Sequence, residues 1–284
     1  MEEQETGKSE RLDQYVVRQI PGLSRSAAAK LIEQGKVLVD SQPQTKAGYR
    51  VRSTNAVEIS HDPTTEVVPD IELEVLYEDD DCVVIDKPAG VLVHSKGVFN
   101  PEATVATWLR NRVKGLEDER AGIVHRLDRA TSGVMICAKT PQALSWLQKQ
   151  FSQRKTKKRY EAVVAGTPDE PEAVIDMPIE RNPKRPQTFR AGMNGKSATT
   201  HYKILTANDT CSLLELQPTT GRTHQLRVHL SHIGHPILGD ELYGGPPAER
   251  LFLHAHSLEL TLPNRQRKTF TIPTPTTFKK MAGV

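Results

Sequence analysis

Apolar positions at helical spacing open the chain, before any longer strand pattern begins. An apolar stripe predicts a first helix from Leu12 to Ile20, and Ser24 is expected to cap a second helix that ends at Gly35. A short apolar run at 37–39 then predicts a strand. Two short helices followed by a few strands form a small unit, near the lower size limit for independent stability.

From residue 71 onward, strand patterns dominate. Alternation over 71–76 predicts an exposed strand, and Cys82 to Ile85 is a continuous apolar run typical of a buried one. Helices are predicted at 104–114, from Pro141 with Thr140 as its cap, and over 223–233. The last few residues are expected to fray. Further strands are predicted at 91–93, 123–124, 134–137, from 160, 199–202, 212–216, 251–253, 258–260 and 270–272.

The composition changes sharply between these two parts. Residues 61–81 contain nine Asp or Glu and no Lys or Arg, and Pro63 and Pro69 interrupt the early portion. We therefore predict a disordered tail at 1–9, a small domain at 10–60, a linker at 61–70 and a second domain at 71–284.

The whole-chain totals describe a globular protein with only a mild positive charge. A net charge of +3 over 284 residues hardly points to nucleic acid by itself, so the local distribution of charge must decide. The three cysteines are far apart in or beside apolar runs and are expected to be buried free thiols in a reducing compartment. Neither a secretory signal nor an apolar run long enough to span a bilayer is found, which predicts a cytoplasmic protein that does not enter membranes.

Positive charge gathers in two segments. Residues 8–60 hold nine Lys or Arg against five Asp or Glu, and no acidic residue lies between Ala143 and Tyr160. Such runs indicate either a solvated helix end or a polyanion site, and we favour the polyanion for the second segment. A further basic loop at 181–190 could follow an RNA backbone.

The densest chemistry lies in residues 121–140, AGIVHRLDRATSGVMICAKT. Two strand-like apolar runs enclose a segment rich in charges, hydroxyls and glycine, with Asp128 between two arginines. An ionised carboxylate held by charge-assisted hydrogen bonds is one interpretation. The other is a turn in which the Asp side chain binds its own backbone, and for this segment alone the two are about even.

A second dense segment, TTGRTHQLRVHLSHIGH, spans residues 219–235. Its histidines 229, 232 and 235 invite a metal site, but the three-residue spacing is not the i, i+4 pair that puts two imidazoles on one helix face. We therefore predict no metal.

These segments carry a resemblance to a known family. HRLDRATSG closely resembles the signature of the RluA-type pseudouridine synthases, and GRTHQLRVHL, DKPAG and HPILGDELYGG are similar to other segments of that family. In the first sixty residues, ERLDQYV and SRSAAAKLIEQGKVLVD resemble the S4 RNA-binding domain. The resemblance implies an α+β fold: a mixed, largely antiparallel central sheet with flanking helices, plus a small S4-like α/β domain.

The resemblance also implies roles for residues. Asp128 is then the catalytic residue, Arg222 the arginine that pairs with its carboxylate, and Tyr160 the aromatic that stacks on the target base. Arg126 would occupy the position that the flipped uridine leaves in the RNA. The other expected substrate-binding residues are His125, Thr131, Lys158 and Leu226, and the expected RNA-binding residues are Arg11, Arg25, Lys30, Lys155, Lys157 and Arg185.

Conversion of uridine to pseudouridine transfers no electron, phosphate or acyl group, so we expect no cofactor. Asp128 could attack C1′, take the C2′ proton or add to C6 of the base, and its sequence context does not choose among these. Large-subunit ribosomal RNA is the expected partner, with transfer RNA second, and the protein is expected to act as a monomer. A nucleoside glycosylase or hydrolase and a non-catalytic RNA-binding or ribosome-assembly factor are the alternative functions.

Overall fold

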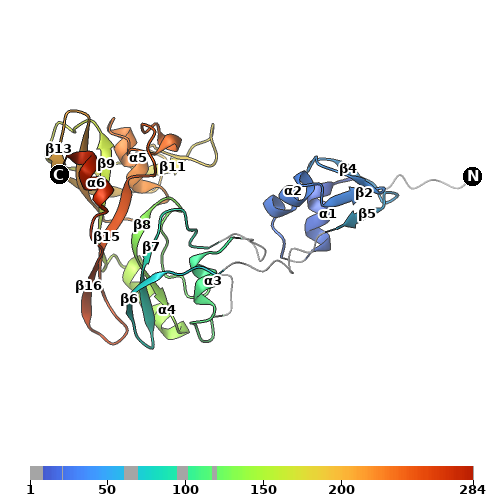
Figure 1. Cartoon of the computed structure of the whole chain (residues 1–284), viewed down its shortest axis with the longest axis horizontal. Helices are drawn as coiled ribbons and strands as arrows, with labels where there is room; N and C mark the ends of the chain where they lie inside the picture. Colours follow the sequence, from blue (N-terminus) through green and yellow to red (C-terminus); the bar gives the residue numbers. More distant parts are fainter. Residues whose placement is uncertain (1–8, 21, 61–69, 95–101, 117–119, 284) are drawn as a thin grey trace, which may run out of the picture. The chain divides into compact units, whose positions relative to one another are not determined.

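The computed structural model describes residues 9–20, 22–60, 70–94, 102–116 and 120–283 (Figure 1). Two compact units make up the chain: the first comprises residues 1–71 with 94–107, and the second 72–93 with 108–284. The predicted tail and linker lie, apart from Ser9 and Asp70, outside the described residues. Within the described residues, no helix has the length and apolar character that crossing a membrane requires.

The first unit has the predicted helices. Helices α1 (Leu12–Gln19) and α2 (Arg25–Glu33) pack on a shared core that includes Leu12, Val16 and Ile32. The Ser24 hydroxyl accepts a hydrogen bond from the Ala27 amide at 3.2 Å and so caps α2, as predicted. The small strands are β1 (Glu10–Arg11) paired with β4 (Arg50–Val51), and β2 (Val37–Val39) between β3 (Gln42–Pro43) and β5 (Val57–Ile59).

A nine-stranded sheet forms the second unit. Its strands run in the order β10, β13, β14, β9, β15, β8, β7, β6, with β16 also paired to β15. Only β15 and β8 pair in parallel, so the sheet is mixed and largely antiparallel, which confirms the predicted α+β fold. The strands are β6 (Glu74–Glu78), β7 (Cys82–Lys87), β8 (Ser132–Ala138), β9 (Lys157–Ala165), β10 (Glu172–Asp176), β13 (Thr199–Ala207), β14 (Cys211–Pro218), β15 (Leu253–Thr261) and β16 (Arg267–Thr271).

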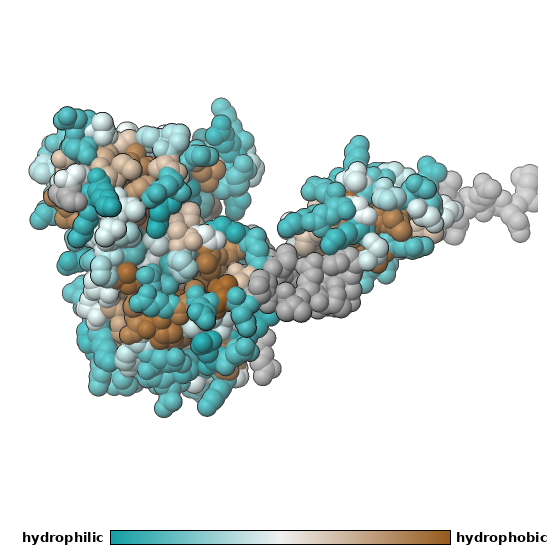
Figure 2. Space-filling model, viewed as in Figure 1, coloured by the Kyte–Doolittle hydropathy of each residue, from teal (hydrophilic) through white to brown (hydrophobic). Residues whose placement is uncertain are grey.

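Helices and a small hairpin surround this sheet. Thr140 caps α4 (Pro141–Ser152) through the Ala143 amide, at 3.2 Å, as predicted. A separate hairpin pairs β11 (Ile179–Arg181) with β12 (Phe189–Ala191). The other helices of the second unit are α5 (Gln225–His232), the short 3₁₀ helix η2 (Glu241–Tyr243) and α6 (Thr276–Ala282), and α3 (Val105–Leu109) contains the boundary of the two units, after residue 107. Most of the viewed surface is hydrophilic, and apolar residues gather in the region of β6 (Figure 2).

Several predicted elements differ from the structure. Helix α3 ends at Leu109 rather than residue 114, because the following residues include Asn111, Val113 and Gly115, which have low helix propensity. Residues 123–124 contribute only an isolated bridge, from Ile123 to Cys137. Residues 251 and 252 of the run predicted at 251–253 are outside any strand, and Leu253 begins β15, which also contains the run at 258–260. The C-terminus does not fray at α6, whose fully buried Phe278 packs on Phe252 with ring centroids 4.9 Å apart.

The close approach of β8 to β15 positions the loop that carries Asp128. Gly133 follows the first residue of β8 and has φ +117°, and a Cβ atom there would lie 2.3 Å from the Ala255 carbonyl oxygen of β15. Only glycine fits this backbone. The loop that leads into β8 therefore lies close to β15. Strand β9 pairs with the other side of β15.

Candidate active site

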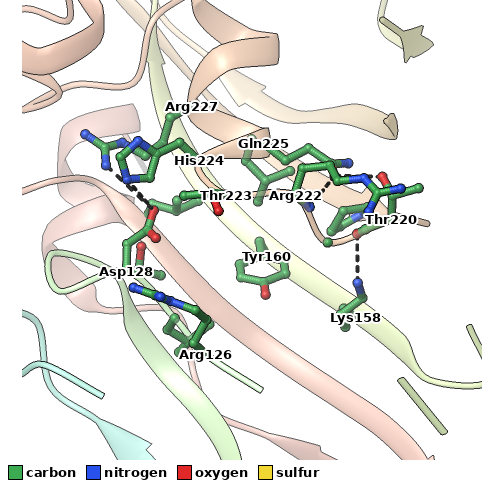
Figure 3. Close-up of a pocket in the computed structure, with 16 residues that line it drawn as sticks. Arg126, Asp128, Lys158, Tyr160, Thr220, Arg222, Thr223, His224, Gln225 and Arg227 are labelled. Carbon is green, nitrogen blue, oxygen red and sulfur yellow. Dashed lines mark hydrogen bonds and ion pairs between the residues drawn. The ribbon is translucent and has the colours of Figure 1, made fainter. Parts of the chain in front are cut away.

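Four segments of the second unit enclose a cavity of about 130 Å³, here called the catalytic cavity (Figure 3). The loop before β8 contributes Asp128, strand β9 contributes Tyr160 and Lys158, β15 contributes Leu253, and the connection from β14 into α5 contributes Pro218 and residues 220–227. The dense motifs of the sequence thus meet at one place, and the catalytic cavity is the candidate active site.

Asp128 lies at one end of this cavity, with its side chain 20% exposed. One of its carboxylate oxygens lies 3.6 Å from a terminal guanidinium nitrogen (Nη1) of Arg227 and 3.8 Å from His224 Nε2. Its backbone carbonyl accepts a hydrogen bond from the Thr131 amide at 3.1 Å, which closes the turn. The carboxylate therefore faces two nitrogen donors from α5 and its cap.

A second carboxylate fixes Arg227. Asp240, which is 1% exposed, accepts hydrogen bonds from Arg227 Nε at 2.7 Å and Nη2 at 2.6 Å. Burial by itself lowers the pKa of Arg227, but the hydrogen bonds to Asp240 and the charges of Asp240 and Asp128 outweigh it and raise that pKa. A bidentate pair of this kind has one defined geometry, so the remaining guanidinium edge stays directed at Asp128.

His224 reaches Asp128 from an unusual backbone conformation. It is the residue before α5 and has φ 55°, in the left-handed region. Its Nδ1 lies 2.7 Å from the hydroxyl of Tyr243, and that hydroxyl already accepts a hydrogen bond from the Phe189 amide at 3.0 Å. The Tyr243 hydroxyl then donates to Nδ1, which leaves the proton of the neutral ring on Nε2, facing Asp128. Burial lowers the pKa of His224, despite the opposing charge of Asp128, and so favours the neutral ring.

The predicted ion pair between Arg222 and Asp128 is not formed, although both residues lie in the described part of the chain. Arg222 Nε instead donates to the Ser197 carbonyl at 3.0 Å, and Figure 3 shows Arg222 beside Thr220, on the side of the cavity away from Asp128. The arginine that faces Asp128 is Arg227, five residues further along the same motif. Arg222 still lines the catalytic cavity.

Tyr160 lies in the middle of the lining, between Asp128 and Lys158 (Figure 3). Burial, with a smaller effect of the Asp128 charge, raises the pKa of its phenol, so the hydroxyl stays protonated at neutral pH. Leu226 and Thr131 also line the cavity, and both are largely buried. Leu226 supplies part of the apolar wall and Thr131 supplies a hydroxyl. These three predicted residues are therefore brought together with Asp128.

Lys87 supports the loop of Asp128 from below. It is fully buried, and its ammonium donates to the carbonyls of Pro88 at 2.9 Å, Val91 at 2.8 Å and Arg129 at 3.2 Å. Burial lowers the pKa of Lys87 to about 8, although the charge of Asp128 opposes this. One of these carbonyls, that of Val91, belongs to the predicted strand at 91–93, which the structure does not form.

Of two other predicted substrate-binding residues, only one lines the catalytic cavity. Arg126 is exposed and lines it. His125 does not line it: its ring stacks on Phe151 with centroids 4.5 Å apart, and its Nε2 accepts a hydrogen bond from the Ile136 amide at 3.2 Å. His125 therefore packs the wall behind the loop.

The predicted RNA-binding residues are all on surfaces, but several are already paired. Arg11 and Arg25 both donate to the buried carboxylate of Asp13, at 2.9–3.0 Å. Lys157 lies 3.3 Å from Glu259. The side chains of Lys30, Lys155 and Arg185 are exposed.

Sequence patterns did not single out the four residues that fix the surroundings of Asp128. His224 and Arg227 lie inside the predicted motif, whereas Asp240 and Tyr243 belong to the segment HPILGDELYGG, in which no site residue was predicted. A buried acid in an otherwise apolar and glycine-rich turn was the available signal for Asp240, since such a group needs a cationic partner.

Two of the three histidines considered for a metal, His229 and His235, have other partners. His229 is buried and bonds to the Thr200 hydroxyl at 3.0 Å and the Met177 carbonyl at 2.9 Å, and His235 bonds to the Ala165 carbonyl at 2.8 Å. Among the described residues, no group of three or more His, Cys, Asp or Glu side chains is placed to hold a metal ion.

Comparison with known proteins identifies the second unit. Residues 81–232 match the RNA pseudouridylate synthase family, which is more than half of the chain. The chain belongs to the RNA pseudouridine synthase family. It is therefore an RNA isomerase, and residues 10–57 match the S4 domain, so this pseudouridine synthase also carries an RNA-binding domain.

Relatives and solved structures agree with this assignment. The synthase is 40% identical to ribosomal large subunit pseudouridine synthase D of Nitrosomonas europaea, over 89% of this chain and 78% of the relative. It is 38% identical to an uncharacterized RNA pseudouridine synthase of Synechocystis, over 95% of this chain and 88% of the relative. The solved structure of human RNA pseudouridylate synthase domain containing 1 is similar with a TM-score of 0.61 at 30% identity, covering 72% of this chain and 84% of that one.

Proposed function

We propose that this synthase isomerises specific uridines of large-subunit ribosomal RNA, with Asp128 as the catalytic residue. The observation that carries the proposal is the position of the Asp128 carboxylate, which faces Arg227 and His224 in a cavity that Tyr160 also lines. The choice of RNA rests on two relatives named ribosomal large subunit pseudouridine synthase D and on the S4 match.

The isomerisation breaks the bond from C1′ to N1, turns the uracil, and forms a bond from C1′ to C5. The proton on C5 is lost and N1 gains one, so the product has the same atoms as the substrate. Attack at C1′, removal of the C2′ proton and addition to C6 all begin with an ionised carboxylate near the target nucleotide. Arg227 and His224 would stabilise that ionised form and direct its oxygens in each case.

The structure supports a stacking role for Tyr160 over a proton-transfer role. A phenol with a raised pKa is a poor base at neutral pH, so the C5 proton would leave to another acceptor. Its ring would lie on one face of the uracil, with Leu226 as part of the apolar wall. Arg126, exposed at the edge, would enter the position vacated by the flipped uridine, which offsets an unstacking cost of a few kcal/mol.

Mapping of pseudouridine in RNA from cells with and without this protein tests the substrate. We expect at least one large-subunit uridine to lose its modification without the protein, and to regain it when the purified synthase acts on an unmodified transcript. Loss confined to transfer RNA would move the substrate to the second expected class. Unchanged maps in both RNAs would contradict the proposal.

The alternative functions predict different products. A glycosylase or hydrolase would release free uracil, whereas isomerisation releases tritium from C5 without changing the mass of the RNA. A non-catalytic assembly factor would bind the RNA and leave it unmodified. We expect Asp128→Asn to bind RNA normally and to lose at least about a thousandfold in activity.

We further propose that the synthase acts as a monomer in the cytoplasm.

A further inference from the structure

A second and larger cavity adjoins the catalytic cavity and is not used in the steps described so far. It has a volume of about 530 Å³, against about 130 Å³ for the catalytic cavity, and is here called the flanking cavity. The two cavities share six lining residues, Arg126, Lys158, Tyr160, Thr220, Gly221 and Arg222. Whatever occupies the flanking cavity is therefore next to the target uridine.

Four cations and no carboxylate line the flanking cavity: Arg126, Arg154, Lys158 and Arg222. Within the described part of the chain, none of these four side chains is in an ion pair with an acidic residue. The neighbouring cations of β9 differ, since Lys157 is 3.3 Å from Glu259 and Arg159 is 3.6 Å from Glu215. Among the described residues of β9, Lys158 thus lines the cavity without an acidic partner, whereas Lys157 and Arg159 lie outside it and are paired.

Lys158 and Arg154 are held in states that an anion would stabilise. Lys158 Nζ has one hydrogen-bond acceptor, the Thr220 carbonyl at 2.9 Å, and burial together with the charge of Arg154 lowers its pKa to about 8. Arg154 has φ 56°, a left-handed conformation that costs backbone energy in a residue other than glycine. A ligand with negative charge would offset both the desolvation and the repulsion.

The flanking cavity also has an aromatic, uncharged part to its lining. Phe151 at the end of α4 stacks on His125 with an interplanar angle of 18°, and burial lowers the pKa of His125 to about 3, so the ring is neutral. Bases stack on such surfaces whatever their identity, while phosphates bind the cations. The combination suits a whole nucleotide rather than a free anion, and the volume lies in the range of small-molecule pockets.

We propose that the flanking cavity binds the nucleotide next to the target uridine, with the phosphodiester between them at Arg154 and Lys158 and the neighbouring base on the Phe151 side. This rests on the proposed function, because it takes the catalytic cavity as the site of the target. The flanking cavity then sets affinity and local RNA conformation, and the chemistry stays at Asp128.

Binding of a fluorescent synthetic RNA that spans the mapped uridine tests the proposal in the full-length Asp128→Asn protein. Arg154→Gln should weaken binding about tenfold and reduce the slope of log affinity against log salt by about one. Arg159→Gln is the matched control: it removes the same charge five residues away, from a side chain outside both cavities. We expect it to leave both quantities unchanged.

Single methylphosphonate linkages, which are uncharged, show which phosphodiester is bound. Placed 5′ or 3′ of the target uridine, one of them should weaken binding about tenfold in the Asp128→Asn protein and have no further effect once Arg154→Gln is also present. Equal binding by Arg154→Gln and Arg159→Gln would overturn the proposal. So would a loss of affinity from each of the two linkages that adds to the loss from Arg154→Gln. Failure of the proposed function differs, since protein with Asp128 intact would then bind this RNA and form no pseudouridine.

Discussion

Asp240 accepts two hydrogen bonds from Arg227, at 2.6 and 2.7 Å, and the Asp240 side chain is completely buried. The pair leaves the Nη1 edge of Arg227 facing Asp128 at 3.6 Å. Asp240 thus fixes the guanidinium of Arg227, and Asp128 faces its remaining edge. The orientation of the catalytic group consequently depends on a residue in the turn after α5, outside the cavity itself.

Arg227 and Arg222 should differ sharply on mutation. Arg227→Gln removes the cation beside Asp128, so we expect kcat to fall by about 10²–10³. Arg222→Gln removes a side chain bonded to the Ser197 carbonyl and should raise KM with kcat nearly unchanged. Single-turnover rates on the mapped RNA measure both, and an Arg222→Gln variant with the larger loss in rate would restore the pairing predicted from the sequence.

Asp240→Asn should damage the same site through Arg227. The amide keeps the shape but leaves a buried guanidinium with a weaker partner, so we expect stability to fall by about 3 kcal/mol and kcat to fall as well. Urea unfolding and single-turnover rates report the two effects. Glu241→Gln is a suitable control, because it is the next residue and is exposed. A stable and fully active Asp240→Asn protein would show that Arg227 needs no anchor.

His224 is expected to act as a positioning residue, with its Nε2 facing the Asp128 carboxylate at 3.8 Å. His224→Ala should lower kcat by about 10²-fold and change KM little, whereas His224→Gln, which retains a donor, should recover part of the rate. Tyr243→Phe removes the hydroxyl that bonds to Nδ1 and should give an intermediate loss. A purely structural role would instead lower stability and leave Gln no better than Ala, which thermal unfolding of the three variants would reveal.

Lys87 should be needed for the shape of the Asp128 loop. Lys87→Met removes three hydrogen bonds from a fully buried ammonium to backbone carbonyls, and hydrogen bonds to charged groups contribute about 1.5–3 kcal/mol each. We expect a loss of several kcal/mol in urea unfolding together with a fall in kcat. The exposed Lys149→Met on α4 is the control for charge and should behave as wild type. An active, stable Lys87→Met protein would contradict the supporting role.

Sequence patterns predicted the elements and the gathering of the motifs better than the pairing inside the site. Cys82 to Ile85 is buried as its apolar run predicts, and Asp128 and Tyr160 reach one cavity. Arg227 lies on α5 and Arg222 on the preceding loop, as the helix predicted at 223–233 already implies. Which of the two faces Asp128 therefore depends on their tertiary contacts, with Asp240 and Ser197 respectively. The partners Asp240 and Tyr243 come from tertiary packing, which periodicity along the chain does not encode.

Buried neutral histidine should make this synthase less stable in mild acid. His254 is 2% exposed, lies 2.9 Å from the Ser132 hydroxyl, and has a pKa that burial lowers to about 4, whereas the unfolded chain protonates it near 6.5. Its contribution to stability is therefore complete above about pH 6.5. It decreases as the pH falls toward 4, by up to about 1.4 kcal/mol per pH unit, because the unfolded state takes up the proton first.

His254→Asn removes this titration and can keep a hydrogen bond to Ser132. We expect urea unfolding of the variant to lose less stability than wild type between pH 7 and pH 5, by about 2 kcal/mol. His201→Asn, at an exposed position of β13, should lose as much as wild type. Parallel losses in all three proteins would mean that His254 takes up its proton in the folded state and that acid sensitivity arises elsewhere. A smaller loss confined to His254→Asn would locate it in the β8 and β15 contact that supports the Asp128 loop.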